Sequence, residues 1–315
     1  MIESVKPAIE GKAAAVLLRD ELRIDFDHLE EIGDGQISRT YSLDIGGRPY
    51  VLQFTERNMS QGCLNELFYG ESLRQMEIPV RSVLHEGDFA GLHFTLAAKV
   101  HGRGLSQLSM GEFMAVLPSV MDILLRIASV DISGTTGFGW LGLDGNGRFE
   151  SWREHLCQVR DEEPGQFYGL WHTLFDSTFL DKKVFDHYYT KMESLIDLTP
   201  SRRELVHGGL CGGNVLVNGG QVTAVLDWQD ARYGDHVFDL AYMLYWLDRS
   251  VQEACMNVYE ESLRKLGRSE AGLRDRVRCY QYYTSVDALR FTAKTRNERF
   301  YRAVLDKLAL LDEAG

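Results

Sequence analysis

Residues Leu205 to Asp239 read LVHGGLCGGNVLVNGGQVTAVLDWQDARYGDHVFD, and this stretch decides the fold that we expect. Two apolar arms, Val215 to Val217 and Val222 to Leu226, flank the turn Asn218-Gly219-Gly220. Because Gly and Asn adopt positive φ at low cost, this composition predicts a tight β-hairpin.

The hairpin would hold two loops side by side. The first loop carries His207 and Asn214, and the second begins at Asp227. An amide oxygen and a carboxylate would then leave one end of the hairpin at neighbouring points. Hard oxygen ligands on a rigid frame suit Mg²⁺, so Asn214 and Asp227 are our candidate metal ligands.

These loops resemble the catalytic and metal-binding loops of the aminoglycoside phosphotransferase family, a branch of the protein-kinase-like fold. The first reads His207-Gly208-Gly209, then four residues and Asn214, and the second reads Val225-Leu226-Asp227-Trp228. Gly234-Asp235 and Asp239-Leu240-Ala241 match the start of the family's next helix. The family's first loop has Asp where Gly209 stands.

Gly209 removes the carboxylate that the resemblance assigns to orienting and deprotonating the acceptor hydroxyl. General-base assistance is typically worth about 10² to 10⁴ in rate. Its loss should impair transfer without preventing binding of nucleotide or acceptor. Three explanations stay open: an engineered or accidental inactive variant, a natural protein that binds without catalysis, or an enzyme that recruits another carboxylate, for which Asp230 is the candidate.

Composition excludes some classes of partner. The chain has 315 residues, of which 44% are hydrophobic and 25% charged, as is ordinary for a globular protein long enough for two domains. A net charge of −12 argues against binding to nucleic acid or to an anionic membrane. Five irregularly spaced cysteines fit neither a disulfide framework nor a zinc site. We expect a cytoplasmic monomer.

The resemblance implies an α+β, bilobal kinase-like fold, with a nucleotide-binding N-lobe over residues 1–100 and a larger, mostly helical C-lobe over 101–315. The N-lobe pattern predicts a five-stranded antiparallel sheet with helices before and within it. The helices are expected at 6–22 and Gln61 to Met76, and the strands at Glu30 to Ile32, Thr40 to Ile45, Tyr50 to Phe54, Arg81 to Phe89 and Gly91 to Lys99.

Nucleotide contacts are assigned by the same resemblance. Gly35 and Ser38, in a glycine-bearing turn, are the candidates for contact with phosphate. The third strand should end with a basic residue but has Gln53, which supplies no charge. Glu66 stands where the acidic partner of that base would be, and a solvated helix charge is an equal alternative. Adenine would lie against Ala97, Ala98 and Lys99, before a connector at 100–104.

The C-lobe is predicted to be built from six long helices. The helices are expected at Met110 to Val130, Asp181 to Leu198, Asp239 to Leu247, Val251 to Leu266, Leu273 to Thr295 and Glu298 to Leu311.

Two local segments of the C-lobe, Thr135 to Gly139 and Ser151 to Arg153, resemble those of the family's hygromycin B phosphotransferases. Candidate contacts for the acceptor are Asp230, Asp235 and Trp246, although for Asp235 we favour a helix-capping role.

Together these features predict a phosphotransferase that moves the γ-phosphate of ATP or GTP, with Mg²⁺, to a hydroxyl of a small cationic antibiotic such as an aminoglycoside. One alternative is a non-catalytic protein that binds nucleotide or antibiotic. Another is a kinase of a different small alcohol, such as a macrolide or a metabolite.

Overall fold

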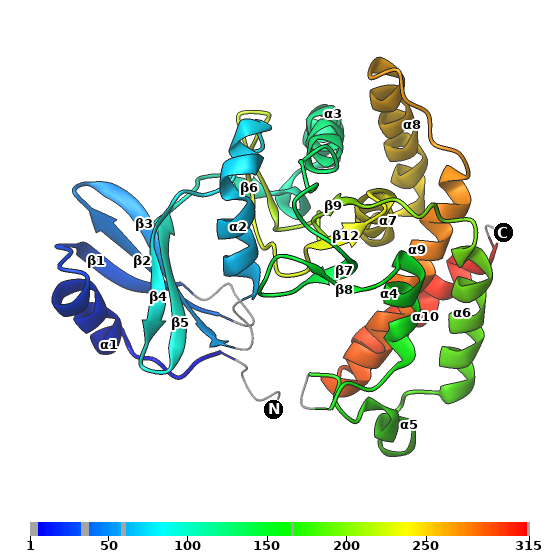
Figure 1. Cartoon of the computed structure of the whole chain (residues 1–315), viewed down its shortest axis with the longest axis horizontal. Helices are drawn as coiled ribbons and strands as arrows, with labels where there is room; N and C mark the ends of the chain where they lie inside the picture. The colour runs from blue at the N-terminus through cyan, green and yellow to red at the C-terminus, as the bar shows by residue number, and fades with distance from the viewer. Residues whose placement is uncertain (1–5, 33–37, 58–60, 165–166, 314–315) are drawn as a thin grey trace. The chain divides into compact units, whose positions relative to one another are not determined.

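The computed structural model describes residues 6–32, 38–57, 61–164 and 167–313 (Figure 1). Two compact units divide the chain. One comprises Glu3–Ser119 with Gly212–Asp230, and the other comprises Val120–Cys211 with Ala231–Gly315. This division differs from the two lobes expected from the sequence, because the hairpin that carries Asn214 and Asp227 belongs with the first unit.

A five-stranded antiparallel sheet forms the main part of the first unit, as predicted. Its strand order is β1-β2-β3-β5-β4. Hydrogen bonds join each neighbouring pair in antiparallel register. The strands are β1 (Asp27–Ile32), β2 (Arg39–Ile45), β3 (Arg48–Glu56), β4 (Val83–Phe89) and β5 (Leu92–Ala98), and helix α2 (Gln61–Gln75) lies between β3 and β4 in sequence.

Alternating apolar residues bury one face of this sheet. Leu52, Phe54 and Leu96 are fully or almost fully buried and pack with Leu17 and Leu18, which follow the short helix α1 (Gly11–Val16). The N-terminal α-helix is shorter than the range 6–22 expected from the sequence, because residues Leu17–Glu21 form a π-helical turn after α1. Burial of these side chains, each worth about 1.5–3 kcal/mol, holds this segment against the sheet.

The predicted hairpin is present in the first unit. Strands β10 (Val215–Asn218) and β11 (Gln221–Val225) pair antiparallel, and β6 (Arg103–Gly104) adds a third strand. Gly219 and Gly220 form the turn with φ of 58° and 79°. These are the left-handed conformations that a two-residue hairpin turn of this type requires.

The second unit combines a small sheet with long helices. Its sheet has the order β8-β7-β12-β9. Helix α9 (Leu273–Lys294) is buried along most of its length and contacts α6, α7 and α10. Figure 1 shows α6 and α10 alongside α9. The strands are β7 (Phe138–Leu141), β8 (Gly147–Phe149), β9 (Glu204–Val206) and β12 (Arg232–Gly234).

The remaining helices confirm the mostly helical character expected after residue 101. Helix α3 (Met110–Ile127) spans the point at which the two units divide. Among the described residues, no helix is both long and apolar enough to cross a bilayer. The other helices are α4 (Trp152–Cys157), α5 (Leu174–Ser177), α6 (Lys182–Ile196), α7 (Val237–Trp246), α8 (Arg249–Lys265) and α10 (Glu298–Glu313), with 3-10 turns at Leu105–Gln107, Gln158–Arg160 and Trp171–Thr173.

Candidate functional site

Asn214 and Asp227 leave the same end of the hairpin. Val215 faces Val225 in the register, and the backbone N–H of Leu226 donates to the carbonyl oxygen of Asn214 at 2.8 Å. Residues joined in this way have neighbouring Cα atoms, so an amide and a carboxylate are presented from adjacent positions. This is the arrangement that the sequence predicted for a pair of metal ligands.

Asp227 has a backbone conformation that is uncommon outside glycine. Its φ is 63°, in the left-handed region, which Asp tolerates better than most residues. Such conformations gather at functional sites, where the surrounding structure holds them in place. The residue is exposed, yet nearby protein atoms remove enough water to raise the pKa of the carboxyl, while the backbone N–H of Gln229 and the charge of Arg81 oppose this rise.

The first loop is held by buried groups of the second unit. The ring of His207 is fully buried, and its Nδ1 accepts the backbone N–H of Gly209 at 3.1 Å. The carboxylate of Asp239, on α7, accepts the N–H groups of His207 at 2.8 Å and of Gly208 at 2.7 Å. His207 and Asp239 therefore act on the shape of the loop. Sequence reasoning assigned Asp239 only to the start of a helix.

Gly209 is buried in this loop, and its carbonyl oxygen accepts the N–H of Cys211 at 2.8 Å. Among the described residues of the loop, Gly208 and Gly212 have positive φ, of 82° and 51°. Gly209 is not among the residues with positive φ, so the backbone conformation alone does not demand glycine there.

The candidates for contact with phosphate are only partly described. Gly35 lies outside the described residues. The hydroxyl of Ser38 accepts a hydrogen bond from Nε2 of Gln53 at 2.8 Å and lies 3.3 Å from the hydroxyl of Thr55. The structure thus links Ser38 to Gln53, which lies within β3.

Glu66 is not a solvated charge, and that alternative is wrong. Its side chain is only 3% exposed, and both carboxylate oxygens accept hydrogen bonds from Nε of Arg81, at 2.8 and 3.0 Å. Burial raises the pKa of Glu66, and the charge of Arg81 opposes that rise. Sequence reasoning missed Arg81, because it looked for the partner of Glu66 only at Gln53.

Helix α2 also contacts the loop of Asp227. The side-chain amide of Asn65 donates to the carbonyl oxygen of Trp228 at 2.9 Å, and both residues are buried. This bond joins the residue before Glu66 to the residue after Asp227. The acidic helix residue and the candidate metal ligand are therefore placed by one connected framework.

The segment expected to meet adenine is used in the sheet. The backbone N–H of Ala98 donates to the carbonyl oxygen of Ser82 at 2.8 Å, and the backbone N–H of Lys99 donates to the carbonyl oxygen of Pro49 at 3.0 Å. Ala97 is buried within β5. The contact of Ala97 to Lys99 with a base stays a prediction.

The three candidates for acceptor contact differ in their surroundings. Asp230 is exposed in the first unit, and Trp246, 38% exposed, lies at the end of α7 and stacks on Phe300. Asp235 is completely buried, and its oxygens accept hydrogen bonds from Arg276 and Tyr280. A carboxylate enclosed in this way cannot meet an acceptor, so we drop Asp235 from the candidate site.

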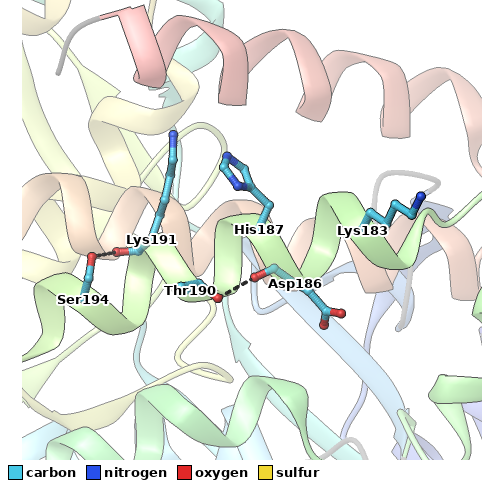
Figure 2. Close-up of a pocket in the computed structure, with 6 residues that line it drawn as sticks. All are labelled: Lys183, Asp186, His187, Thr190, Lys191 and Ser194. Carbon is cyan, nitrogen blue, oxygen red and sulfur yellow. Dashed lines mark hydrogen bonds between the residues drawn. The ribbon is translucent and has the colours of Figure 1, made fainter.

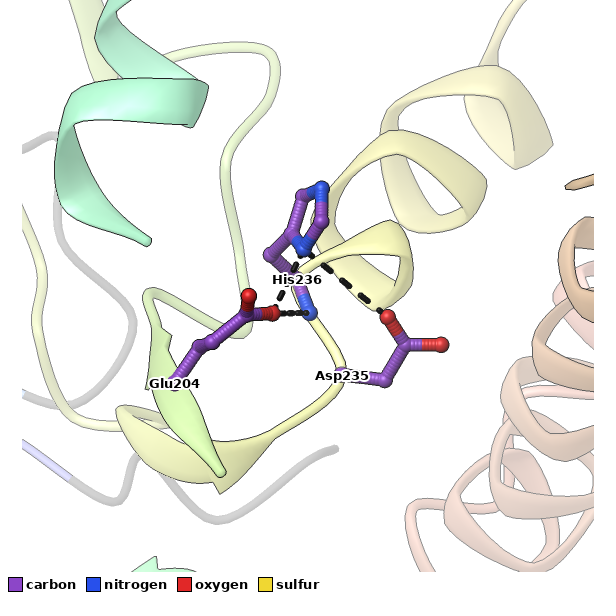
Figure 3. Close-up of side chains that lie close together, drawn as sticks. All are labelled: Glu204, Asp235 and His236. Atoms are coloured by element: carbon purple, nitrogen blue, oxygen red, sulfur yellow. Dashed lines mark hydrogen bonds and ion pairs between the residues drawn. The ribbon is translucent and has the colours of Figure 1, made fainter. Parts of the chain in front are cut away.

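A second cluster has the composition of a metal site but a different role. Ligand atoms of Glu204, Asp235 and His236 lie within 4.8 Å of one another (Figure 3). The ring of His236 is engaged at both nitrogens, by Glu204 at 2.6 Å and by the hydroxyl of Tyr259 at 2.7 Å. Arg276 binds both oxygens of Asp235. The cluster is a buried ion-pair network that joins β9, α7, α8 and α9.

A hollow on the surface of the second unit contains none of the predicted residues. Figure 2 shows that its lining comes from a single helix, α6. One helix face with mixed charges gives no converging set of polar groups, so this hollow is a poor candidate for the site. It is lined by Lys183, Asp186, His187, Thr190, Lys191 and Ser194.

Comparison with known proteins agrees with the hairpin geometry. Residues 28–278 match the model of the phosphotransferase enzyme family. The chain belongs to this family. The predicted kinase-like fold is thereby confirmed, and the match covers the sheet, α2, the hairpin and most of the second unit.

One curated member of the family is similar in sequence. Hygromycin-B 4-O-kinase of Escherichia coli is 31% identical over 221 residues, which is 69% of this chain and 62% of the relative. The match thus spans less than two thirds of that relative's length. The kinase activity in its name is that of the relative, and its transfer to this chain is a proposal.

Solved structures of the family extend the likeness to nearly the whole chain. A thermostable mutant of aminoglycoside phosphotransferase APH(4)-Ia, in ternary complex with AMP-PNP and hygromycin B, is 25% identical with a TM-score of 0.78, covering 96% of this chain and 98% of that one. Macrolide 2'-phosphotransferase from Brachybacterium faecium has a TM-score of 0.62 at 15% identity, covering 95% and 98% of the two chains, and shows the shared fold alone.

Proposed function

We propose that this chain binds ATP or GTP and directs its γ-phosphate to a hydroxyl of an aminoglycoside-like antibiotic, with hygromycin B as the first acceptor to test. The placement of Asn214 and Asp227 at one end of the hairpin carries the proposal. Membership of the phosphotransferase family and the likeness to hygromycin kinases support the choice of acceptor. We place the protein in the cytoplasm as a monomer.

Asn214 and Asp227 fit Mg²⁺, because an amide oxygen and a carboxylate are hard ligands of the kind this ion prefers. When bound, the ion neutralises charge on the phosphates. The chain's own part is to orient the two ligands. It does so through the hairpin register and through the left-handed conformation of Asp227.

Phosphoryl transfer depends mainly on positioning and on electrostatic stabilisation, since its transition state is loose. The loop held by His207 and Asp239 supplies the backbone frame for the acceptor hydroxyl. Gly209 offers no carboxylate to accept the hydroxyl proton. We therefore propose slow transfer, with Asp230 and Trp246 as contacts for the acceptor.

A second candidate function follows from the same loop. A protein that holds nucleotide or antibiotic without turnover would need neither a base at residue 209 nor a charge at residue 53. Gly209 and Gln53 favour this candidate.

One experiment separates the two functions. Phosphate transfer from radiolabelled ATP or GTP to hygromycin B and to a panel of aminoglycosides is measured with Mg²⁺ for the wild-type chain, for Gly209→Asp and for the matched Gly209→Asn. Slow transfer that rises about 10²- to 10⁴-fold only in Gly209→Asp supports a phosphotransferase lacking its base. Nucleotide binding without transfer in all three supports the binder.

A further inference from the structure

We propose that Arg81 supplies the positive charge for the nucleotide's phosphates that the third strand lacks. This inference rests on the proposed function and identifies the residue that replaces the expected strand cation. Gln53 lies within β3, at the position where the resemblance requires a basic residue. Glu66 is nevertheless buried on α2, where an unpaired carboxylate would be costly.

Arg81 lies just before β4 and reaches both residues. Its Nε donates to the two oxygens of Glu66 at 2.8 and 3.0 Å, and its Nη1 donates to Oε1 of Gln53 at 3.1 Å. The Arg81 side chain is 15% exposed. The guanidinium is therefore fixed from two sides beside the position that a cation on β3 would occupy.

The same contacts decide which end of the Gln53 side chain faces Ser38. Because Oε1 of Gln53 accepts from Arg81, its Nε2 is the end that donates to the hydroxyl of Ser38, at 2.8 Å. A continuous chain of hydrogen bonds thus runs from Glu66 through Arg81 and Gln53 to Ser38. The neutral side chain of Gln53 thus connects Arg81 to Ser38, a candidate for contact with phosphate.

A guanidinium suits this place, because it is always charged and its planar donors match phosphate oxygens. The acidic residue of α2 is thus paired with a cation as in other kinases, but here the cation comes from the segment just before β4 and not from β3.

The test measures binding of Mg·ATP and of adenosine to the full chain by isothermal titration calorimetry. Arg81→Gln is expected to weaken Mg·ATP binding by about tenfold or more, the usual effect of losing one strong charged contact, and to leave adenosine binding within about twofold. The matched control is Arg48→Gln, which removes an exposed charge from the same sheet. Equal affinity of Arg81→Gln and wild type for Mg·ATP would overturn the inference alone.

Two double variants separate charge from folding. Glu66→Gln with Arg81→Gln removes both charges of the buried pair. If Arg81→Gln alone does not fold, Mg·ATP and adenosine binding are compared between this double variant and the wild type. Gln53→Lys with Arg81→Gln returns the cation to β3 beside Glu66 and should recover Mg·ATP affinity to within about threefold. If this variant folds but recovers no affinity for Mg·ATP, the proposal that Arg81 supplies the charge missing at residue 53 is contradicted. A wild-type chain that binds neither ligand would overturn the proposed function together with this inference.

Discussion

The carboxylate of Asp239 accepts the backbone N–H of His207 at 2.8 Å. Its other oxygen accepts the next N–H, that of Gly208, at 2.7 Å. A single buried side chain on α7 therefore fixes two successive peptide groups of the loop that carries Gly209. Without this carboxylate, both N–H groups would be buried without an acceptor, which is costly. Conformations of the loop that turn these N–H groups away from Asp239 are therefore disfavoured.

Asp239→Ala should destabilise the fold by about 2 kcal/mol or more at pH 7, because two buried N–H groups lose their acceptor. Urea unfolding followed by circular dichroism measures the change in the free energy of unfolding. Asp306→Ala, which truncates an exposed carboxylate, is the control and should change stability by less than about 0.5 kcal/mol. Equal stability of the two variants would argue that Asp239 does not hold the loop.

The effect of Asp239 should also depend on pH. Burial raises its pKa from 3.8 to about 6 in the folded chain, against the two backbone hydrogen bonds and the nearby cations. The folded chain then binds this proton more tightly than the unfolded chain. The stability that Asp239 contributes is therefore greatest below pH 4, declines as the pH rises from about 4 to about 6, and stays constant above that.

The difference in unfolding free energy between wild type and Asp239→Ala should thus shrink by up to about 3 kcal/mol between pH 4 and pH 7. Urea titrations at four pH values across this window measure it. A difference that grew with rising pH would show that the folded-state pKa is lowered instead.

Local sequence signals were sufficient for the hairpin and for the first sheet. Asn218-Gly219-Gly220 demands positive φ, and apolar residues with period two fix which face of each strand is buried. Asn214 and Asp227 could be placed for the same reason, because the register of a short hairpin follows from its turn. These features depend on residues close together in the chain.

The errors concern partners that are distant in sequence. Glu66 pairs with Arg81, 15 residues away, and Asp235 pairs with Arg276, 41 residues away. No periodicity marks which buried carboxylate a given arginine will reach. The sequence therefore left Glu66 open between a solvated charge and a functional residue, and favoured a helix cap over acceptor contact for Asp235 without indicating either arginine. Tertiary packing decides such pairs, and it was the tertiary contacts that removed Asp235 from the site.

Asp227→Asn should separate metal binding from folding. Asn tolerates the left-handed conformation of residue 227, so the loop can keep its shape while one charged ligand is lost. We expect Mg²⁺-dependent affinity for ATP to fall at least about tenfold, which is about 1.4 kcal/mol. Thermal unfolding should stay the same or improve, because desolvation already disfavours the charged carboxyl. Calorimetry with and without EDTA measures the first effect, and undiminished Mg²⁺ dependence would exclude Asp227 as a ligand.

Gly234→Ala should disrupt the second unit, because strand β12 approaches the ring of Trp152 closely. A Cβ at residue 234 would lie 2.3 Å from that ring, which is only 2% exposed. We expect a loss of stability of about 1–3 kcal/mol or more. Gly111→Ala is the matched control: its Cβ meets nothing within 4 Å, and α3 should gain up to about 1 kcal/mol. Thermal denaturation of both variants should therefore shift in opposite directions.

Arg276 tests whether the acidic cluster of the second unit is structural. Its guanidinium binds both oxygens of Asp235 and donates to Glu270 at 2.8 Å, and arginine and aspartate are almost fully buried. Arg276→Met would leave the buried carboxylate of Asp235 without its arginine, whereas Glu270 keeps the ion pair with Arg202 at 2.6 Å. We expect a cost of about 3–5 kcal/mol in unfolding free energy. Arg276→Met with Asp235→Asn should recover part of that loss, because the uncompensated charge is gone.

The exposed pair of Arg274 and Glu253 provides the control for this comparison. Arg274→Met should change stability by less than about 1 kcal/mol, since solvent screens that pair.

A metal-binding role for Glu204, Asp235 and His236 can be tested directly. If Zn²⁺ or Mn²⁺ stabilised the wild type but not Asp235→Asn, these three residues would be able to exchange their ion pairs for a metal, and the structural role would be contradicted. We expect neither ion to raise the unfolding temperature through this cluster. Arg276 already binds the oxygens of Asp235, and the hydroxyl of Tyr259 is hydrogen-bonded to Nε2 of His236, so these ligand atoms are not available to a metal.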